Sequence, residues 1–126
     1  MKKKRKKLTK RQEQDKSLRA SFEFFNDRFF GGEISLSTTV RFAKVFKKER
    51  VPADGHYFPN TQIIEIDENY RTRGRKMELI LLHEMAHAWL YQTKGYVGYA
   101  HDEGHGTTFQ GVICRLIQIG AYDGLL

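Results

Sequence analysis

The feature that most constrains this chain is the pentapeptide His83-Glu84-Met85-Ala86-His87, which lies inside an apolar run from 77 to 91. A segment that is apolar on nearly every face predicts a buried helix. On a helix, His83 and His87 lie one turn apart on the same face, so both imidazoles can reach a single metal ion. The apolar flanks disfavour a pair of surface histidines. A buried pair satisfied by hydrogen bonds remains the alternative.

Glu84 lies between the two histidines in the sequence and adds a second kind of chemistry. Its position on the helix is suited to holding a water molecule beside the ion. Two histidines with an adjacent glutamate are typical of zinc peptidases, in which the glutamate is the general base. The pattern therefore predicts one Zn²⁺ per chain and Glu84 as the catalytic residue.

A catalytic zinc site takes a third protein ligand and leaves the fourth position to water. The downstream candidates for that ligand are His101, Asp102, Glu103 and His105. Gly104 and Gly106 let the backbone bend tightly around His105, and Thr107 or Thr108 can cap a following helix. Because a ligand at a loop-to-helix junction is held more firmly than one inside a loop, we favour His105 over His101.

Two motifs of this chain resemble the SprT-like metalloprotease domain of bacterial SprT proteins and the eukaryotic Spartan protease. They are the segment 83–88 and the later sequence Gly104-His105-Gly106-x-x-Phe109. Asn26 and the segment 29–34 also resemble the family, and the resemblance covers about residues 18 to 120. It implies His83, His87 and His105 as zinc ligands. It also implies a protease that acts on DNA-bound or DNA-crosslinked proteins.

The expected mechanism uses Glu84 to take a proton from water and to pass it to the leaving amine. The substrate is expected to lie along a sheet edge as an added strand, with 62–67 as the candidate edge. Tyr96 and Tyr99 are candidate donors to the oxyanion. Two rival functions are a non-enzymatic nucleic-acid-binding module with a structural zinc, and a peptidase that acts on a soluble regulator independently of DNA.

The element pattern predicts an α+β fold with a zincin-like core. A helix from Thr9 to Phe30 has an apolar stripe at helical spacing, and the pair Gly31-Gly32 ends it. Strands within 36–46, at 56–58 and at 62–67 predict a small antiparallel sheet. The metal helix spans 75–92. A closing helix spans 107–119, and its apolar face comprises Phe109, Val112, Ile113, Leu116 and Ile117.

Length and composition predict one soluble, intracellular, monomeric domain at 9–126. That compartment is cytoplasm or nucleoid in a bacterium and the nucleus in a eukaryote. No apolar run is long enough to span a membrane, and the N-terminus lacks the apolar stretch of a signal peptide. The single cysteine, Cys114, excludes an internal disulfide and is expected to be a small core residue. It also excludes the four-cysteine zinc ribbon that many SprT-like proteins carry.

The net charge of +7 is concentrated in the first 11 residues, which carry eight basic groups and no acid. The other 14 basic residues face 15 acidic ones, so the body has a net charge of −1. Residues 1–8 are expected to be a disordered basic tail that contacts DNA without sequence preference. A solubilising tail or a nuclear address is the alternative. The candidate DNA contacts are Lys2, Lys3, Lys4, Arg5, Lys6 and Lys7 in the tail, and Arg71, Arg73 and Arg75 on the body.

Overall fold

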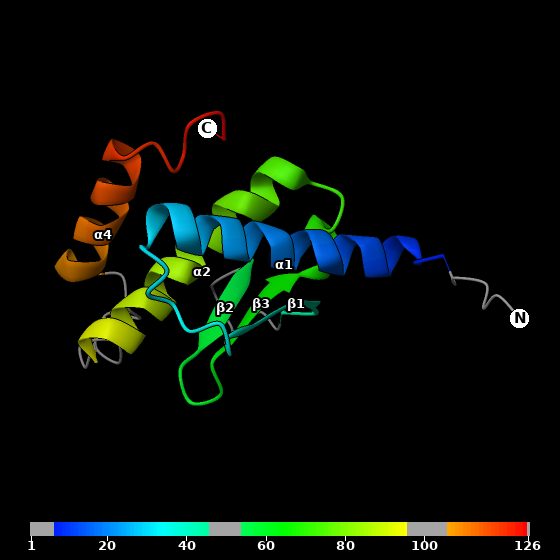
Figure 1. Ribbon diagram of the computed structural model, residues 1–126, viewed down its shortest axis with the longest axis horizontal. Coiled ribbons are helices and arrows are strands. Elements are labelled where there is room, and N and C mark those ends of the chain that lie inside the picture. Colours follow the sequence, from blue (N-terminus) through cyan, green and yellow to red (C-terminus); the bar gives the residue numbers. More distant parts are fainter. Residues whose placement is uncertain (1–6, 46–53, 96–105, 126) are drawn as a thin grey trace, which may run out of the picture.

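The computed structural model describes residues 7–45, 54–95 and 106–125, and it confirms an α+β fold. Three helices and a three-stranded sheet make up the described part of the chain (Figure 1). In chain order the elements are α1 (Lys10–Phe29), β1 (Thr39–Ala43), β2 (Gly55–Phe58), β3 (Ile63–Asp67), a 3-10 helix η1 (Glu68–Tyr70), α2 (Gly74–Lys94) and α4 (Thr107–Gln118). None of the described helices is long and apolar enough to cross a bilayer.

Helix α1 begins and ends where the sequence predicts. The Thr9 hydroxyl accepts a hydrogen bond from the backbone N–H of Gln12, and the Gln12 side chain accepts one from the Thr9 N–H. Leu18, Phe22 and Phe25 form the buried stripe. In the last turn of the helix, the buried side chain of Asn26 donates to the carbonyl of Ile34 and accepts from its N–H. Asn26 thus fixes the turn that leads from α1 towards the sheet.

The sheet is mixed, so the prediction of an antiparallel sheet is only partly right. The strand order is β1-β3-β2, with β3 antiparallel to β2 and parallel to β1. Strand 62–67 was predicted as an edge, and this is wrong because β3 is central. Its side chains explain its position, since Ile64 and Ile66 are fully buried. The most β-branched strand lies in the centre, where both its edges and one face are covered.

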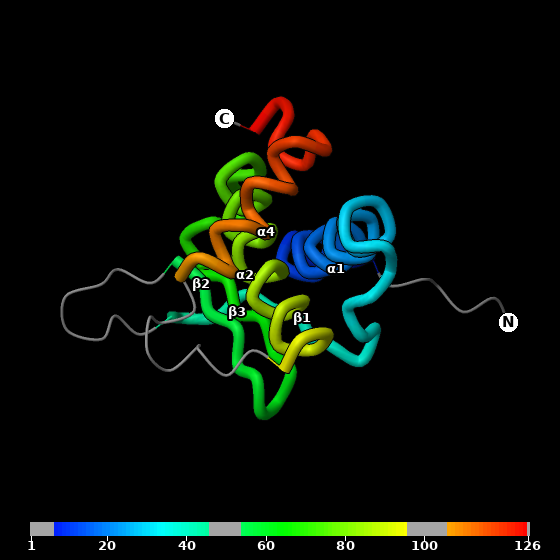
Figure 2. Tube along the Cα trace, turned by 90° about the vertical axis from the view of Figure 1, so that its left-hand side faces the viewer, coloured from blue at the N-terminus to red at the C-terminus, as the bar shows by residue number. Residues whose placement is uncertain are grey.

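Helices α1 and α2 lie on one face of the sheet, as the views in Figures 1 and 2 show. Helix α1 packs against β1, and α2 packs against β2 and β3. Helix α4 packs against α2. The Gln92 side chain near the end of α2 accepts from the Ser35 N–H and donates to the hydroxyls of Thr38 and Tyr57. Gln92 therefore joins the metal helix to β2 and to the segment before β1.

Helix α4 agrees with its predicted range, but three details differ. Its N-cap is Gly106 and has no side-chain cap hydrogen bond, so neither Thr107 nor Thr108 caps it. Ile117 is 52% exposed, and Cys114 is exposed rather than in the core. Gly106 has no side chain that could cap the helix, and the two exposed residues follow because α4 packs against α2 through a narrow stripe. Phe109 and Leu116 are its buried residues.

Candidate active site

His83, Glu84 and His87 form one cluster on α2. The potential ligand atoms of these three residues all lie within 4.8 Å of one another. The two imidazole rings are 5.0 Å apart between centroids, and His83 Nε2 is 3.9 Å from Glu84 Oε1. Two imidazole nitrogens and a carboxylate oxygen are donors that zinc prefers. The predicted placement of both histidines on one face of a buried helix is confirmed.

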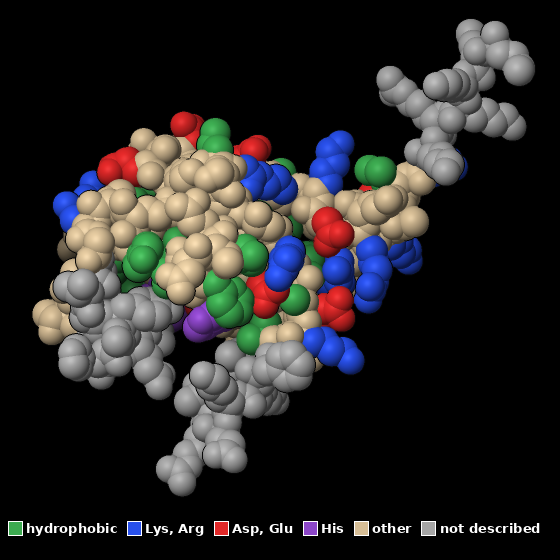
Figure 3. All heavy atoms as spheres, turned by 90° about the horizontal axis from the view of Figure 1, so that it is seen from below, with side chains coloured by type: hydrophobic (Ala, Val, Ile, Leu, Met, Phe, Trp, Pro, Cys, Tyr) green, Lys and Arg blue, Asp and Glu red, His purple; other side chains and the backbone are tan. Residues whose placement is uncertain are grey.

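The cluster is buried on one side and open on the other. Glu84 is 6% exposed and His87 is 3% exposed, while the His83 side chain is 41% exposed. Burial raises the pKa of Glu84 to about 8. On the face shown in Figure 3, histidine side chains reach the surface beside hydrophobic ones. A substrate can therefore approach a cluster whose base is held in an apolar environment.

Phe109, in the first turn of α4, forms a wall against both imidazoles. Its ring stacks on His87 with centroids 4.2 Å apart and an interplanar angle of 17°. It meets the His83 ring edge-on at 4.9 Å. The sequence predicted Phe109 only as a core residue and as part of a motif. The structure adds that this ring holds the orientation of the two candidate ligands.

Gly55, the first residue of β2, is a second contributor that sequence reasoning missed. A Cβ atom at this position would lie 2.7 Å from Ile80 Cγ2, 2.9 Å from the Glu65 carbonyl oxygen and 3.3 Å from Glu84 Cγ. The absence of a side chain therefore lets β2 lie directly against the part of α2 that carries Glu84. The only hint in the sequence is the Asp54-Gly55 pair, which is typical of a turn.

The SprT-like family model matches residues 18–121, which is most of the chain. The chain belongs to the SprT-like family. Searches of curated proteins and of solved structures gave no match. Family membership together with the cluster His83, Glu84 and His87 indicates a zinc metallopeptidase. The zinc itself is implied by the family, and the three clustered side chains fit it.

Several predicted site residues lie outside the described residues of this SprT-like chain. They are the third ligand His105 and its alternative His101, the candidate oxyanion donors Tyr96 and Tyr99, and the tail residues Lys2, Lys3, Lys4, Arg5 and Lys6. Their roles stay predictions. Lys7 is described and lies exposed just before α1.

Of the basic residues predicted to contact DNA from the body, Arg71 already forms ion pairs and packs on an aromatic ring. Its guanidinium lies 2.8 Å from Asp15 Oδ1 and 3.7 Å from Glu68 Oε1, and over the Phe42 ring at 4.6 Å. These contacts join η1 to α1 and β1. Arg73 and Arg75 are exposed at the start of α2, and within the described ranges neither forms an ion pair.

Proposed function

We propose that this chain is a zinc-dependent endopeptidase that cleaves proteins bound or crosslinked to DNA. The observation that carries the peptidase part is the cluster of His83, Glu84 and His87 on a buried helix, in a member of the SprT-like family. In this proposal His83, His87 and His105 hold the zinc, and Glu84 is the general base.

The path of α4 supports His105 as the third ligand. The helix begins at Thr107, two residues after His105, and its first turn places Phe109 on the His87 ring. The chain therefore enters α4 beside the two histidines already assigned. His105 is therefore only four residues before Phe109, the residue of α4 that contacts His87.

The chemistry follows from the burial of Glu84. A zinc ion bound here would polarise the scissile carbonyl and lower the pKa of a water molecule towards about 7. Glu84 takes the proton from the attacking water and then delivers it to the leaving amine. Glu84 is buried directly beside the two histidines, which places its carboxyl group next to the water that it would activate. Tyr96 or Tyr99 would donate to the oxyanion.

A substrate segment fits best along β2. Within the described residues, β2 pairs on only one edge, with β3, and its first residue lies against Glu84. An extended peptide that adds to the other edge of β2 would pass directly beside the base. This replaces our sequence-based choice of 62–67, which is the central strand.

The DNA part of the proposal rests on the location of the basic groups. Arg73, Arg75 and Lys76 surround the start of α2, which has no side-chain cap and no acid in its first turn. Such a helix start attracts phosphate through its backbone N–H groups and its dipole. The ion pairs of Arg71 with Asp15 and of Arg11 with Glu68 hold the start of α1 beside η1. The basic tail therefore joins the body near this cluster.

A peptidase that acts on a soluble regulator is the second candidate. The net charge of the body outside residues 1–11 is −1. Three of its arginines are already paired: Arg19 with Glu23, Arg41 with Glu65 and Arg71 with Asp15. These observations reduce the cationic surface that is free to meet DNA.

The test is proteolysis by the purified chain, measured with and without DNA, beside its zinc content. We expect about one zinc per chain, and Glu84→Gln should keep that zinc and lower the rate by ~10²–10⁴-fold. His105→Ala should lower zinc content far more than His101→Ala. Cleavage by Glu84→Gln at the parent rate would contradict the mechanism. Equal cleavage rates with and without DNA would favour the peptidase that acts on a soluble regulator.

A further inference from the structure

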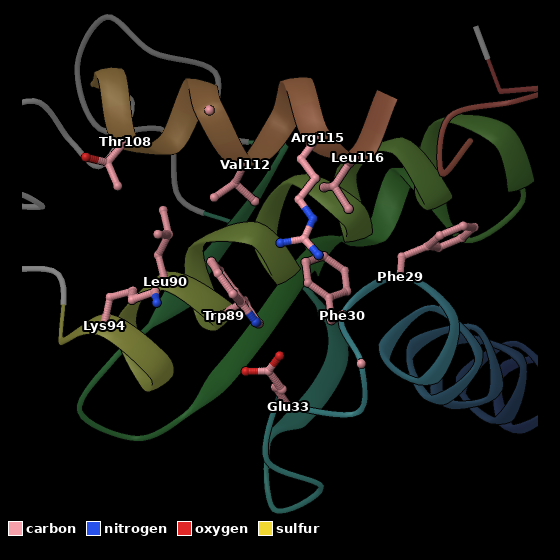
Figure 4. Close-up of a pocket in the computed structure, with 12 residues that line it drawn as sticks. Phe29, Phe30, Glu33, Trp89, Leu90, Lys94, Thr108, Val112, Arg115 and Leu116 are labelled. Carbon is pink, nitrogen blue, oxygen red and sulfur yellow. The ribbon is translucent and has the colours of Figure 1, made fainter. Parts of the chain in front are cut away.

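A second concave site lies next to the metal cluster and shares no residue with it. A cavity of about 490 Å³ opens between the C-terminal half of α2, the helix α4 and the turn after α1. Phe30, Leu90 and Leu116 are its buried apolar walls, and Trp89 forms one side (Figure 4). Its volume lies within the usual range for ligand sites. The metallopeptidase chemistry does not use this cavity.

Charged groups of opposite sign stand across the cavity from one another. Figure 4 shows the Arg115 side chain reaching from α4 towards the rings of Trp89 and Phe30, while Glu33 points towards them from the opposite side. Lys94 lines the cavity at the end of α2, with its Nζ 5.7 Å from the Trp89 ring. In the part of the chain that the structure describes, Arg115 and Glu33 form no ion pair with each other or with a third residue.

Gly111 lies within α4 and is the helix residue without a side chain at the cavity. It lines the cavity, and a Cβ atom added to it would meet no heavy atom within 4 Å. After proline, glycine is the least favourable residue in a helix interior. Glycine therefore leaves open space at this position, which a side chain bound in the cavity can use.

We propose that this cavity binds a protein segment through one bulky apolar side chain. An acidic neighbour in that segment would face Arg115 and Lys94, and a basic neighbour would face Glu33. Tryptophan and arginine are the side chains that most often dominate binding at protein interfaces. A polyanion suits this cavity less well than a peptide, because Glu33 would repel phosphate and because the walls are apolar.

Helices α2 and α4 line the cavity and also form the metal site. A segment bound in the cavity can therefore serve to present the substrate. Thr108 lines the cavity, while its neighbour Phe109 stacks on His87. A segment docked here is therefore held close to Glu84, and the chain attached to it reaches the site at a raised effective concentration. This role as a substrate-docking site rests on the proposed peptidase function, whereas the binding itself does not.

Trp89 provides a direct measurement of binding, since it is the one tryptophan of the chain. The probe is the acetylated and amidated peptide Gly-Lys-Phe-Glu-Gly, titrated into the full-length protein while Trp89 fluorescence is recorded. We expect a saturable change, which should be absent for Gly-Lys-Ala-Glu-Gly because that peptide lacks the anchor. Arg115→Gln should weaken Gly-Lys-Phe-Glu-Gly more than Gly-Lys-Phe-Lys-Gly.

Gly111→Leu is the decisive variant because it fills the cavity and favours the helix. It should weaken peptide binding by at least ~10-fold, as the loss of an interface anchor does. Gln118→Leu is the matched control, since it adds the same side chain to an exposed position of α4 outside the cavity. Its affinity should equal that of the parent, and circular dichroism should show that both variants fold.

Unchanged peptide affinity in Gly111→Leu would overturn the proposal. So would a Trp89 response to a short oligothymidylate but not to the peptide, which would make the cavity a nucleic-acid site. Peptide binding by a chain that cleaves no protein would support the cavity and reject the peptidase. Protein cleavage by a chain whose Trp89 fluorescence does not respond to the peptide would support the peptidase and reject the cavity as a binding site.

Discussion

Glu84 links the stability of the fold to pH. Burial raises its pKa from 4.5 to about 8, so the metal-free folded protein binds a proton that the unfolded chain releases between these values. The stability from this protonated group is fully present below about pH 4.5 and is lost as the pH rises through about 8. In metal-free protein, Glu84→Gln should therefore gain stability over the parent between pH 5 and pH 9, on the order of a few kcal/mol. Urea unfolding of both proteins at each pH measures this. If the free energy of unfolding changed with pH in the same way in both proteins, Glu84 would not be buried as described.

Gly55 gives a second prediction at the residue scale. Gly55→Ala brings a Cβ atom against Ile80 and against the fixed backbone carbonyl of Glu65, so β2 must move away from α2. We expect a loss of about 1–3 kcal/mol in the free energy of unfolding, together with a lower kcat. The control is Gly74→Ala at the start of α2, where an added Cβ meets no atom within 4 Å. Denaturant unfolding of the two variants, beside the parent, should separate them, and equal stability would contradict the close approach of β2.

At the scale of elements, α4 matters because its first turn contacts both candidate metal ligands. Phe109→Leu removes the ring that stacks on His87, and it should lower zinc affinity by ~10–100-fold, as the loss of groups that orient ligands does. Leu116→Ala is the control for stability, since this buried residue of α4 lies outside the site. It should destabilise the fold while leaving zinc affinity nearly unchanged. Competition with a chromophoric chelator measures the affinity. If both variants lost zinc equally, α4 would act only through overall stability.

At the scale of the whole molecule, the basic charge is divided between a tail and a body. Deleting residues 2–7 removes six cations and keeps the Thr9 cap of α1. The slope of log DNA affinity against log salt should flatten by up to ~5, since each phosphate contact on duplex DNA contributes about 0.9. Zinc content and fold should not change. A fluorescence anisotropy titration at several salt concentrations measures the slope. An unchanged slope would identify the tail as a solubilising or addressing segment.

Two arginines of the folded body provide the comparison for the tail deletion. Arg73→Gln with Arg75→Gln should lower DNA-stimulated cleavage at saturating DNA more than the tail deletion does. The reason is that these two side chains lie at the start of the helix that carries Glu84, whereas we expect the tail to contribute only to affinity. Equal effects of both changes on cleavage would contradict this division of roles.

The sequence by itself determined the features that depend on one segment. His83, Glu84 and His87 lie within five residues, and helical geometry alone brings them together. The same holds for α1, whose cap and apolar stripe are local patterns. Only the tertiary structure decided that β3 is central, that Gly55 lies against Glu84, and that Phe109 stacks on His87. It also decided that Cys114 is exposed, because that depends on how much of α4 another element covers. Periodicity reports which side of an element is apolar, but contacts between segments far apart in the chain decide which neighbour covers that side.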